Sequence, residues 1–402
     1  MMNCPTVRNA LFTCMLVSLC LLCATAPGSH AQRHGGMSPV MSGTGPEMVY
    51  TPQSLAGPVR SPEVQEHLRK ELALAADYFL GRGVPHDLTQ SLYWYRKAAE
   101  AGEPLAQVEL GYFYHVGIGV QRNEAEAARW YQRAAASGSA HGKINLASLY
   151  LRGEGVPQNA EVAVNLLRSA ARGGSGTAEA YLGVMSYTGV GMKADAHAAE
   201  KWFKEGVKQH SAEAEFDLAS LYSVHPEHAQ DFGKAAKLLR LSAGRGYVPA
   251  KHSLGLLLVR HPELPQAAGE AASLLGSAAE AGSWRSSLLL GVLARDGRGL
   301  AKDQKAAYRW FRVAYLQGGK ENGAYLSSAV LQMATALSEE DRRAVESEAA
   351  AWFQAHPNKD VYVINDGMDR KYYPLAEVQT MGLPAAPAST TEVGGNLPAS
   401  IF

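Results

Sequence analysis

The feature that most constrains this chain is a stretch that recurs 36 residues later. Residues 110–138 read LGYFYHVGIGVQRNEAEAARWYQRAAASG, and residues 146–174 read LASLYLRGEGVPQNAEVAVNLLRSAARGG. A fixed period of this length is typical of an array of stacked helical or strand units rather than of one globule. The period continues without insertion through seven positions: Gly102, Gly138, Gly174, His210, Gly246, Gly282 and Gly318.

Each unit contains two runs of apolar residues at helical spacing. Leu110 and Tyr114 belong to the first run of one unit, and Ala127 and Tyr131 belong to the second. An Asp or Asn stands where the second run begins, and its short side chain predicts a helix cap. This column consists of Asp87, Asn123, Asn159, Asp195, Asp231 and Asp303, with Ala267 as its exception.

Glycines separate the two runs, and bulky side chains follow them. Gly119 and Gly155 are the second glycines of Gly-x-Gly turns, where a tight connection requires a positive φ. A further column predicts side chains of the core between helices: Trp94, Trp130, Trp202 and Trp310. One helix pair cannot bury its own apolar face, so the sequence predicts an all-α solenoid of about seven 36-residue helix-turn-helix repeats.

The combined motif is A-x-x-x-L-G-x-x-Y, then G-x-G-V-x-x-D/N, then A-x-x-W-Y/F-x-x-A-A-x-x-G. It resembles the Sel1-like repeat, a relative of the tetratricopeptide repeat, over about residues 67–320. The resemblance implies a right-handed α/α superhelix that acts as a binding scaffold, often secreted or membrane-associated in bacteria. The fifth and sixth units depart from the motif, with SVHPEH (223–228) and VRHPEL (259–264) in place of Gly-x-Gly.

The first 31 residues predict a secretory signal peptide. They carry one charged residue, Arg8, followed by an apolar run of about 17 residues, and they end with Ser29 and Ala31 at the positions that signal peptidase prefers. Cleavage before Gln32 would remove all four cysteines and leave a periplasmic or secreted chain without thiols. A retained membrane anchor is the alternative, because the apolar run is near the short limit for a transmembrane helix.

The remaining boundaries follow from composition. Residues 32–60 are rich in Gly, Pro and Ser and predict a flexible linker, and residues 61–320 hold the seven repeats. Residues 321–357 predict C-terminal capping helices, the second with a narrow apolar stripe. Residues 358–402 predict an irregular or disordered tail, with a short hairpin at 361–373 as an alternative.

Charge and motifs argue against several functions. The formal net charge is zero, so no basic surface is predicted for nucleic acid or for a membrane. Motifs of nucleotide loops, zinc proteases and serine hydrolases are missing after residue 31, and the sequence therefore predicts no enzyme, no metal and no cofactor. His225 and His228, with Glu227 between them, offer a metal pair as the alternative. The same His-Pro-Glu recurs at 261–263, which favours a shared turn variant.

The surface that remains for function is the inner face of the first helices. Six residues are predicted to line a concave groove for a protein or peptide: Tyr112, His115, Ser148, Leu151, Val184 and Tyr187. Their apolar and aromatic character suits a peptide or helix with apolar anchors. The alternative for each residue is that it only fills the inner curve of the superhelix.

These observations predict a non-catalytic interaction scaffold in the bacterial cell envelope. Membrane contact would come only through an uncleaved signal peptide or through a partner. Two alternatives remain open at this point. One is a secreted effector that binds a host protein, and the other is a cell-wall hydrolase, for which neither a nucleophile nor a matched carboxylate pair is visible.

Overall fold

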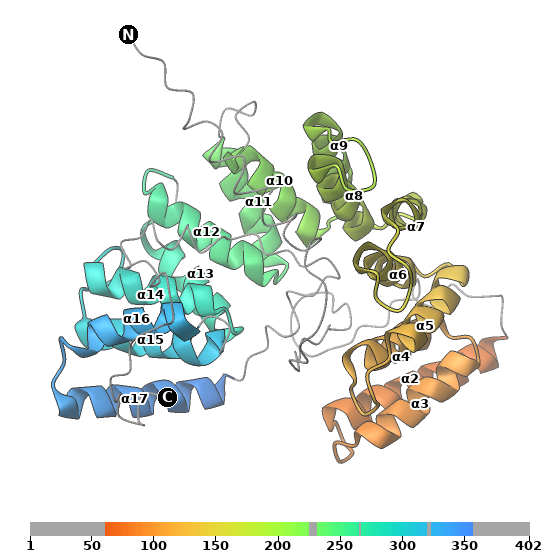
Figure 1. Ribbon diagram of the computed structural model, residues 1–402, viewed down its shortest axis with the longest axis horizontal. Helices are drawn as coiled ribbons and strands as arrows, with labels where there is room; N and C mark the ends of the chain where they lie inside the picture. Colours follow the sequence, from red (N-terminus) through yellow and green to blue (C-terminus); the bar gives the residue numbers. More distant parts are fainter. Residues whose placement is uncertain (1–60, 225–230, 265–266, 320–322, 357–402) are drawn as a thin grey trace, which may run out of the picture. The chain divides into compact units, whose positions relative to one another are not determined.

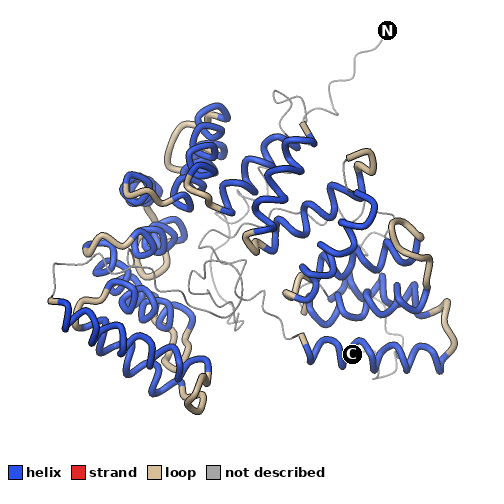
Figure 2. Tube along the Cα trace, turned by 180° about the vertical axis from the view of Figure 1, so that it is seen from behind, coloured by secondary structure: helices blue, strands red, loops and turns tan. Residues whose placement is uncertain are grey.

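The computed structural model describes residues 61–356 apart from 225–230, 265–266 and 320–322. Sixteen helices form this part of the chain, and no strand occurs within these ranges (Figures 1 and 2). The prediction of an all-α fold is therefore confirmed. The signal peptide, the linker and the 361–373 hairpin lie outside the described residues.

The helices form seven pairs, repeats 1 to 7, followed by two further helices. The first member of each pair, helix A, is α2 (Pro62–Leu80), α4 (Pro104–Val116), α6 (Ala140–Arg152), α8 (Gly176–Thr188), α10 (Ala212–Val224), α12 (Val248–Arg260) or α14 (Trp284–Asp296). The second member, helix B, is α3 (Leu88–Glu100), α5 (Glu124–Ala136), α7 (Ala160–Arg172), α9 (Ala196–Lys208), α11 (Phe232–Gly244), α13 (Ala267–Glu280) or α15 (Gln304–Gly318). The chain continues with α16 (Gly323–Ala334) and α17 (Glu339–Ala355).

The Asp/Asn column begins the helices B, as predicted. The Asp87 carboxylate accepts hydrogen bonds from the backbone N–H groups of Thr89 and Gln90 at 2.9 and 3.0 Å. Asn123 accepts one from Glu126 N–H at 3.1 Å. Such caps satisfy backbone donors that the first helical turn leaves without a partner. Ala267 has no side-chain acceptor and is instead the first residue of α13.

The core of each repeat is a match between a small residue on helix A and a large one on helix B, 20 positions later. A Cβ atom added to Gly111 would lie 2.6 Å from the Tyr131 ring, and one added to Gly183 would lie 2.3 Å from the Phe203 ring. Interiors pack at crystal-like density, so the Tyr131 and Phe203 rings leave no room for a side chain on the glycine opposite. The large column is at most 4% exposed: Tyr95, Tyr131, Leu167, Phe203, Leu239, Leu275 and Phe311.

The tryptophan column lies one residue before this core column. Trp130 is 8% exposed and packs on the apolar cluster of α2, α3 and α4. Trp94, Trp202 and Trp310 are half-buried at the edges of their clusters. One residue along a helix turns the side chain by about 100°, so these rings point toward the boundary between repeats and not into the centre of a pair.

The Gly-x-Gly turns pack directly on the preceding repeat. Gly119 and Gly155 have φ of 67° and 66°. A Cβ atom on Gly119 would lie 3.3 Å from Leu88 Cβ, and one on Gly155 would lie 2.1 Å from the backbone oxygen of Glu124. Glycine at these positions therefore serves both the turn and the contact with the start of the previous helix B.

Apolar clusters join successive repeats into an array. Each helix B packs on the next helix A, as α5 does on α6 and α11 on α12 (Figure 1). One cluster contains Phe216, Leu239, Leu254 and Ala271 from four consecutive helices, α10 to α13. The solenoid prediction is therefore confirmed for the stacking of neighbours, while the handedness stays a prediction.

The two ends of the array are formed by atypical helices. Pro62 is the first residue of α2, and Ser61 caps the helix. At the other end, α17 packs on α15, where Trp352 meets Trp310 edge to face with ring centroids 5.5 Å apart. Its Val345 and Ala349 are buried and most of its other residues are exposed, which is typical of a terminal cap with one wet face.

Candidate functional site

The six predicted groove residues fall into two groups by burial. Tyr112, His115 and Ser148 are 3%, 7% and 3% exposed. The other three are half-buried: Leu151, Val184 and Tyr187. The partner-binding role of all six stays a prediction. The side-chain surface that a partner can reach without rearrangement belongs mainly to the second group.

His115 is buried because the next repeat covers it. Its Nε2 atom lies 3.1 Å from Glu154 Oε2, and Glu154 is the middle residue of the Gly-x-Gly turn 39 positions later. At the same spacing, Leu151 and Val190 pack on one apolar cluster. We call each such pair of positions an inter-repeat joint. Two of the predicted groove residues, His115 and Leu151, are therefore members of such joints.

The joint between repeats 2 and 3 is charged. Arg152 Nε donates to Glu154 Oε2 at 2.8 Å, so this oxygen also receives the guanidinium. Burial opposes ionisation of Glu154, but the hydrogen bond from His115 and the charge of Arg152 outweigh it and lower its pKa to about 2. The second ring nitrogen of His115, Nδ1, makes no hydrogen bond among the described residues.

A buried acid lies on α4, the helix A that carries His115. Glu109 is 3% exposed, and burial raises its pKa to about 8. The Tyr131 hydroxyl is fully buried without a hydrogen-bond partner in the described part of the chain. Burial, together with the nearby charge of Glu109, raises the pKa of this phenol. The carboxyl group of Glu109 is therefore mainly protonated near pH 7.

Glu109 belongs to a column that the sequence reasoning missed. Its equivalents on successive helices A are polar for five repeats, and we call them the inner polar column: Glu109, Asn145, Tyr181, Asp217 and Ser253. Four of these are 9% exposed or less, and Asn145 is half-buried. The signal was available, because these residues interrupt an otherwise apolar stretch of each helix A at the repeat period.

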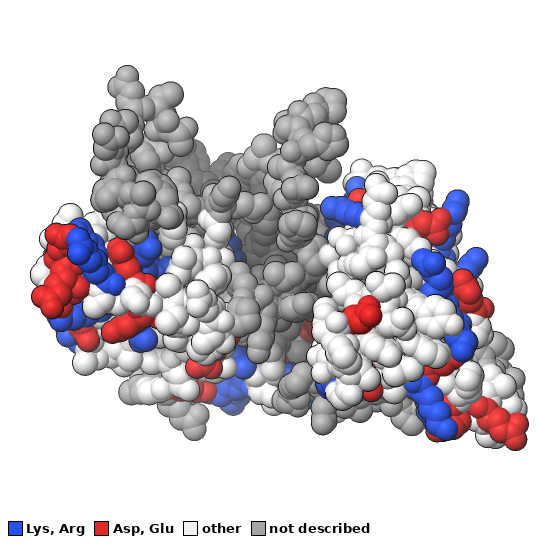
Figure 3. Space-filling view, turned by 90° about the horizontal axis from the view of Figure 1, so that it is seen from below, with Lys and Arg blue, Asp and Glu red and all other residues white. Residues whose placement is uncertain are grey.

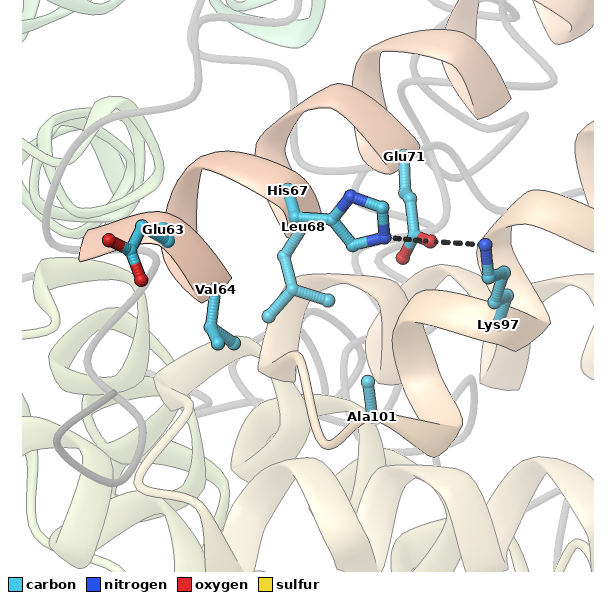
Figure 4. Close-up of a pocket in the computed structure, with 7 residues that line it drawn as sticks. All are labelled: Glu63, Val64, His67, Leu68, Glu71, Lys97 and Ala101. Carbon is cyan, nitrogen blue, oxygen red and sulfur yellow. Dashed lines mark ion pairs between the residues drawn. The ribbon is translucent and has the colours of Figure 1, made fainter. Parts of the chain in front are cut away.

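A pocket of about 360 Å³ opens at the first helix pair (Figure 4). We call it the N-terminal pocket. Its apolar wall comes from Val64, Leu68 and Ala101, and its polar lining from Glu63, His67, Glu71 and Lys97. Glu71 is 4% exposed, and its Oε1 atom lies 3.0 Å from His67 Nε2 and 2.8 Å from Lys97 Nζ (Figure 4). The acid is therefore neutralised by the pocket itself.

The face of the molecule shown in Figure 3 has no patch of a single charge sign. On the face in Figure 3, acidic and basic side chains lie interspersed. Within the described residues, no three His, Cys, Asp or Glu side chains lie together as metal ligands. His261 stacks on Phe232 at 3.9 Å and lies 3.0 Å from Glu263, while His225 and His228 fall outside the described residues. None of the helices that the structure describes is both long and apolar enough to cross a membrane.

Stacked helix pairs that recur every 36 residues define a helical-repeat protein. The family model of the Sel1 repeat matches residues 71–103, 104–139, 140–175, 176–211, 212–247 and 285–319. The chain belongs to the Sel1 repeat family. The stretch 248–284 is not matched, although α12 and α13 form a pair there like the others.

Solved structures with the same fold include a Sel1 repeat protein from Oxalobacter formigenes. It is 24% identical, the match covers 63% of this chain and 98% of that chain, and the TM-score is 0.52. A protective antigen of uropathogenic Escherichia coli with an SLR fold is 24% identical over 82% of this chain and 74% of that one, with a TM-score of 0.37. No curated protein matches the chain.

At these identities the likeness shows the fold alone. Membership in the Sel1 repeat family indicates the general class of function. Sel1 repeat proteins generally mediate protein–protein interaction, and they are typically non-catalytic scaffolds.

Proposed function

We propose that this chain is an exported, non-catalytic scaffold of the bacterial cell envelope that binds a partner polypeptide along the inner faces of its helices A. Membership in the Sel1 repeat family supports the binding of a protein. The signal-like residues 1–31 support export. The partner is a peptide or helix with apolar anchors, because Leu151, Val184 and Tyr187 are the groove residues that keep exposed surface.

The observation that carries this proposal is the register of the helices A. From repeat 2 to repeat 7 each has 13 residues and starts 36 positions after the last. Equivalent side chains therefore recur on one helix after another. A long polypeptide can be held at several such points, each weak alone.

The test replaces two anchors with charge. Val184→Glu together with Tyr187→Glu is expected to weaken partner binding at least about tenfold, since charged groups within an apolar contact remain poorly solvated. The matched control is Leu241→Glu on helix B α11, where Leu241 is 51% exposed. Circular dichroism must show that both variants are folded at the temperature of the binding assay, because Val184 and Tyr187 also pack at the edge of an apolar cluster and their replacement lowers the melting temperature.

The partner is first identified by crosslinking from these positions. A photoreactive residue at 187 should capture one defined protein in the envelope fraction, and a photoreactive residue at 241 should not. Equal capture at both positions, or undiminished binding by the double variant, would reject the assignment of this face. Intact mass of the fractionated chain tests export, because a protein that retains residue 1 and stays in the cytosol contradicts it.

A further inference from the structure

We propose that two copies of this chain associate through their first helix pairs, with α2 antiparallel to α2 of the second copy. Each copy seats Val64 in the N-terminal pocket of the other. This contact is separate from the helix A surface of the proposed function, and its test does not depend on any other partner.

The exposed side chain of Val64 and the N-terminal pocket lie on the same surface of the first helix pair. Val64 is 46% exposed, and it is one of three large hydrophobic residues exposed to this degree among the described residues, with Tyr93 and Leu241. It lines the mouth of a pocket of about 360 Å³, with space for a valine side chain (Figure 4). A two-fold interface uses the same patch on both copies. A protruding Val64 beside a pocket meets this requirement, because each copy can place its Val64 in the pocket of the other.

The second copy cannot simply extend the array at this end. In repeats 2 to 7 the third residue of helix A is small and buried against the preceding helix B: Ala106, Gly142, Ala178, Ala214, Ala250 and Ser286. The spacing is so close that a Cβ atom on Gly142 would lie 2.6 Å from Ala134 Cβ of α5. The equivalent residue of α2 is Lys70, whose side chain is 74% exposed. A helix B packed here would bury the ammonium group, so the second copy packs on α2 in another way, with Lys70 at the edge of the contact.

Charge along α2 favours the same arrangement. Glu63 lies in the first turn, and Lys70 follows seven positions later, two turns along the same side of the helix. Lys70 has only a loose ion pair with Glu66, at 3.8 Å. In an antiparallel pair centred between Glu66 and His67, Glu63 of each copy faces Lys70 of the other. Exposed ion pairs add little affinity, so these two set the register while Val64 supplies the contact energy.

Sedimentation equilibrium of the processed chain, with its first residue established by intact mass, tests the pairing. The wild-type chain is expected to dimerise, and Val64→Glu to raise the dimer dissociation constant at least about tenfold. Leu241→Glu is the matched control, because it places the same charge at an equally exposed apolar site and should leave the constant unchanged.

Charge exchange tests the register. Glu63→Lys and Lys70→Glu should each weaken the dimer, because each creates two like-charge contacts, and the double variant should restore it. A wild-type chain that stays monomeric at tens of micromolar overturns the proposal. A dimer that survives Val64→Glu, or a double variant no tighter than the single ones, also overturns it. Unchanged helical melting curves establish that every variant is folded.

Discussion

Two inter-repeat joints with the same 39-residue spacing differ in chemistry. Between repeats 2 and 3, the position pair 39 residues apart holds His115 and Glu154, with Arg152 on the same carboxylate. Between repeats 3 and 4, the equivalent pair is Leu151 and Val190 on an apolar cluster. The stack therefore requires that the joint be filled, but it does not require a particular chemistry.

The difference lies in what happens when one partner is lost. An apolar joint loses buried area in proportion to the atoms removed. A buried polar joint leaves a group without its hydrogen bond, and that group has already been removed from water. The two joints should therefore respond differently to truncation, to pH and to replacement as pairs.

The largest effect is expected from the glycine that brings the turn of the charged joint onto the previous repeat. Gly155→Val places a β-branched residue at φ 66° with its Cβ 2.1 Å from the Glu124 oxygen, and we expect at least about 3 kcal/mol of destabilisation. Urea denaturation followed by tryptophan fluorescence measures it. Gly174→Ala is the control, because Gly174 has φ 84° and open space, so that only the backbone term of about 1 kcal/mol remains.

Truncation of the joints themselves should separate the two chemistries. Glu154→Ala leaves the buried His115 ring without its acceptor and is expected to cost about 2 kcal/mol, against about 1 kcal/mol for Val190→Ala. Equal costs in urea denaturation would contradict the comparison.

His115 and Glu154 can also be replaced together by the residues that the chain has at another joint. Between repeats 1 and 2 the equivalent residues are Phe79 and Ile118, on one apolar cluster. The double variant His115→Phe with Glu154→Ile should recover most of the stability that Glu154→Ala loses. Failure of this variant to recover stability would show that the charged joint has a geometry of its own.

The charged joint predicts loss of stability in acid. The folded-state pKa of Glu154 is about 2, below its ordinary value of 4.5, so its contribution is full above about pH 4.5 and is lost as the pH falls toward 2. The urea midpoint of the wild-type chain should fall over this range more steeply than that of Glu154→Gln. Parallel curves would contradict the assignment.

Glu109 predicts the opposite dependence of stability on pH. Its folded-state pKa is raised to about 8, so the protonated form favours the folded state. Its contribution is largest below about pH 4.5 and is lost as the pH rises toward 8, where the unfolded chain is already ionised. Glu109→Gln should flatten the decline of the urea midpoint over this range.

The smallest effect is expected at the connection between repeats 4 and 5. His210 occupies the glycine position of the repeat and is the one residue other than glycine with a positive φ, 59°, among the described residues. His210→Gly should stabilise the chain by up to about 1 kcal/mol by removing that strain. His210→Ala should not, because alanine has the same backbone penalty, and a gain with alanine would refute this explanation.

Much of the fold follows from the sequence, because its periods are short and local. The caps at Asp87 and Asn123 and the glycine turns depend on neighbours within one helix pair, and the structure has them as predicted. Trp130 lies in the core as predicted, but the most deeply buried ring of this helix B belongs to the next residue, Tyr131. Size and hydrophobicity favour tryptophan, and only the small residue opposite, Gly111, shows which ring faces inward.

The candidate site was harder to derive. The burial of His115 depends on Glu154 of the following repeat, and a helical period within one unit carries no information about its neighbour. The pairing is visible only when residues 39 positions apart are compared across units. The inner polar column was missed for a related reason, because a single Glu109 in an apolar helix is easily taken for a surface residue.

The constant spacing of the helices A from repeat 2 onward has a further consequence. Since consecutive ones start 36 residues apart, excision of 176–211 would join the end of one unit to the start of an equivalent unit, with no change in helical phase. Evolution can therefore shorten or lengthen the protein by whole repeats. The distance between the first and the last repeat then changes, while the core of each remaining repeat stays the same.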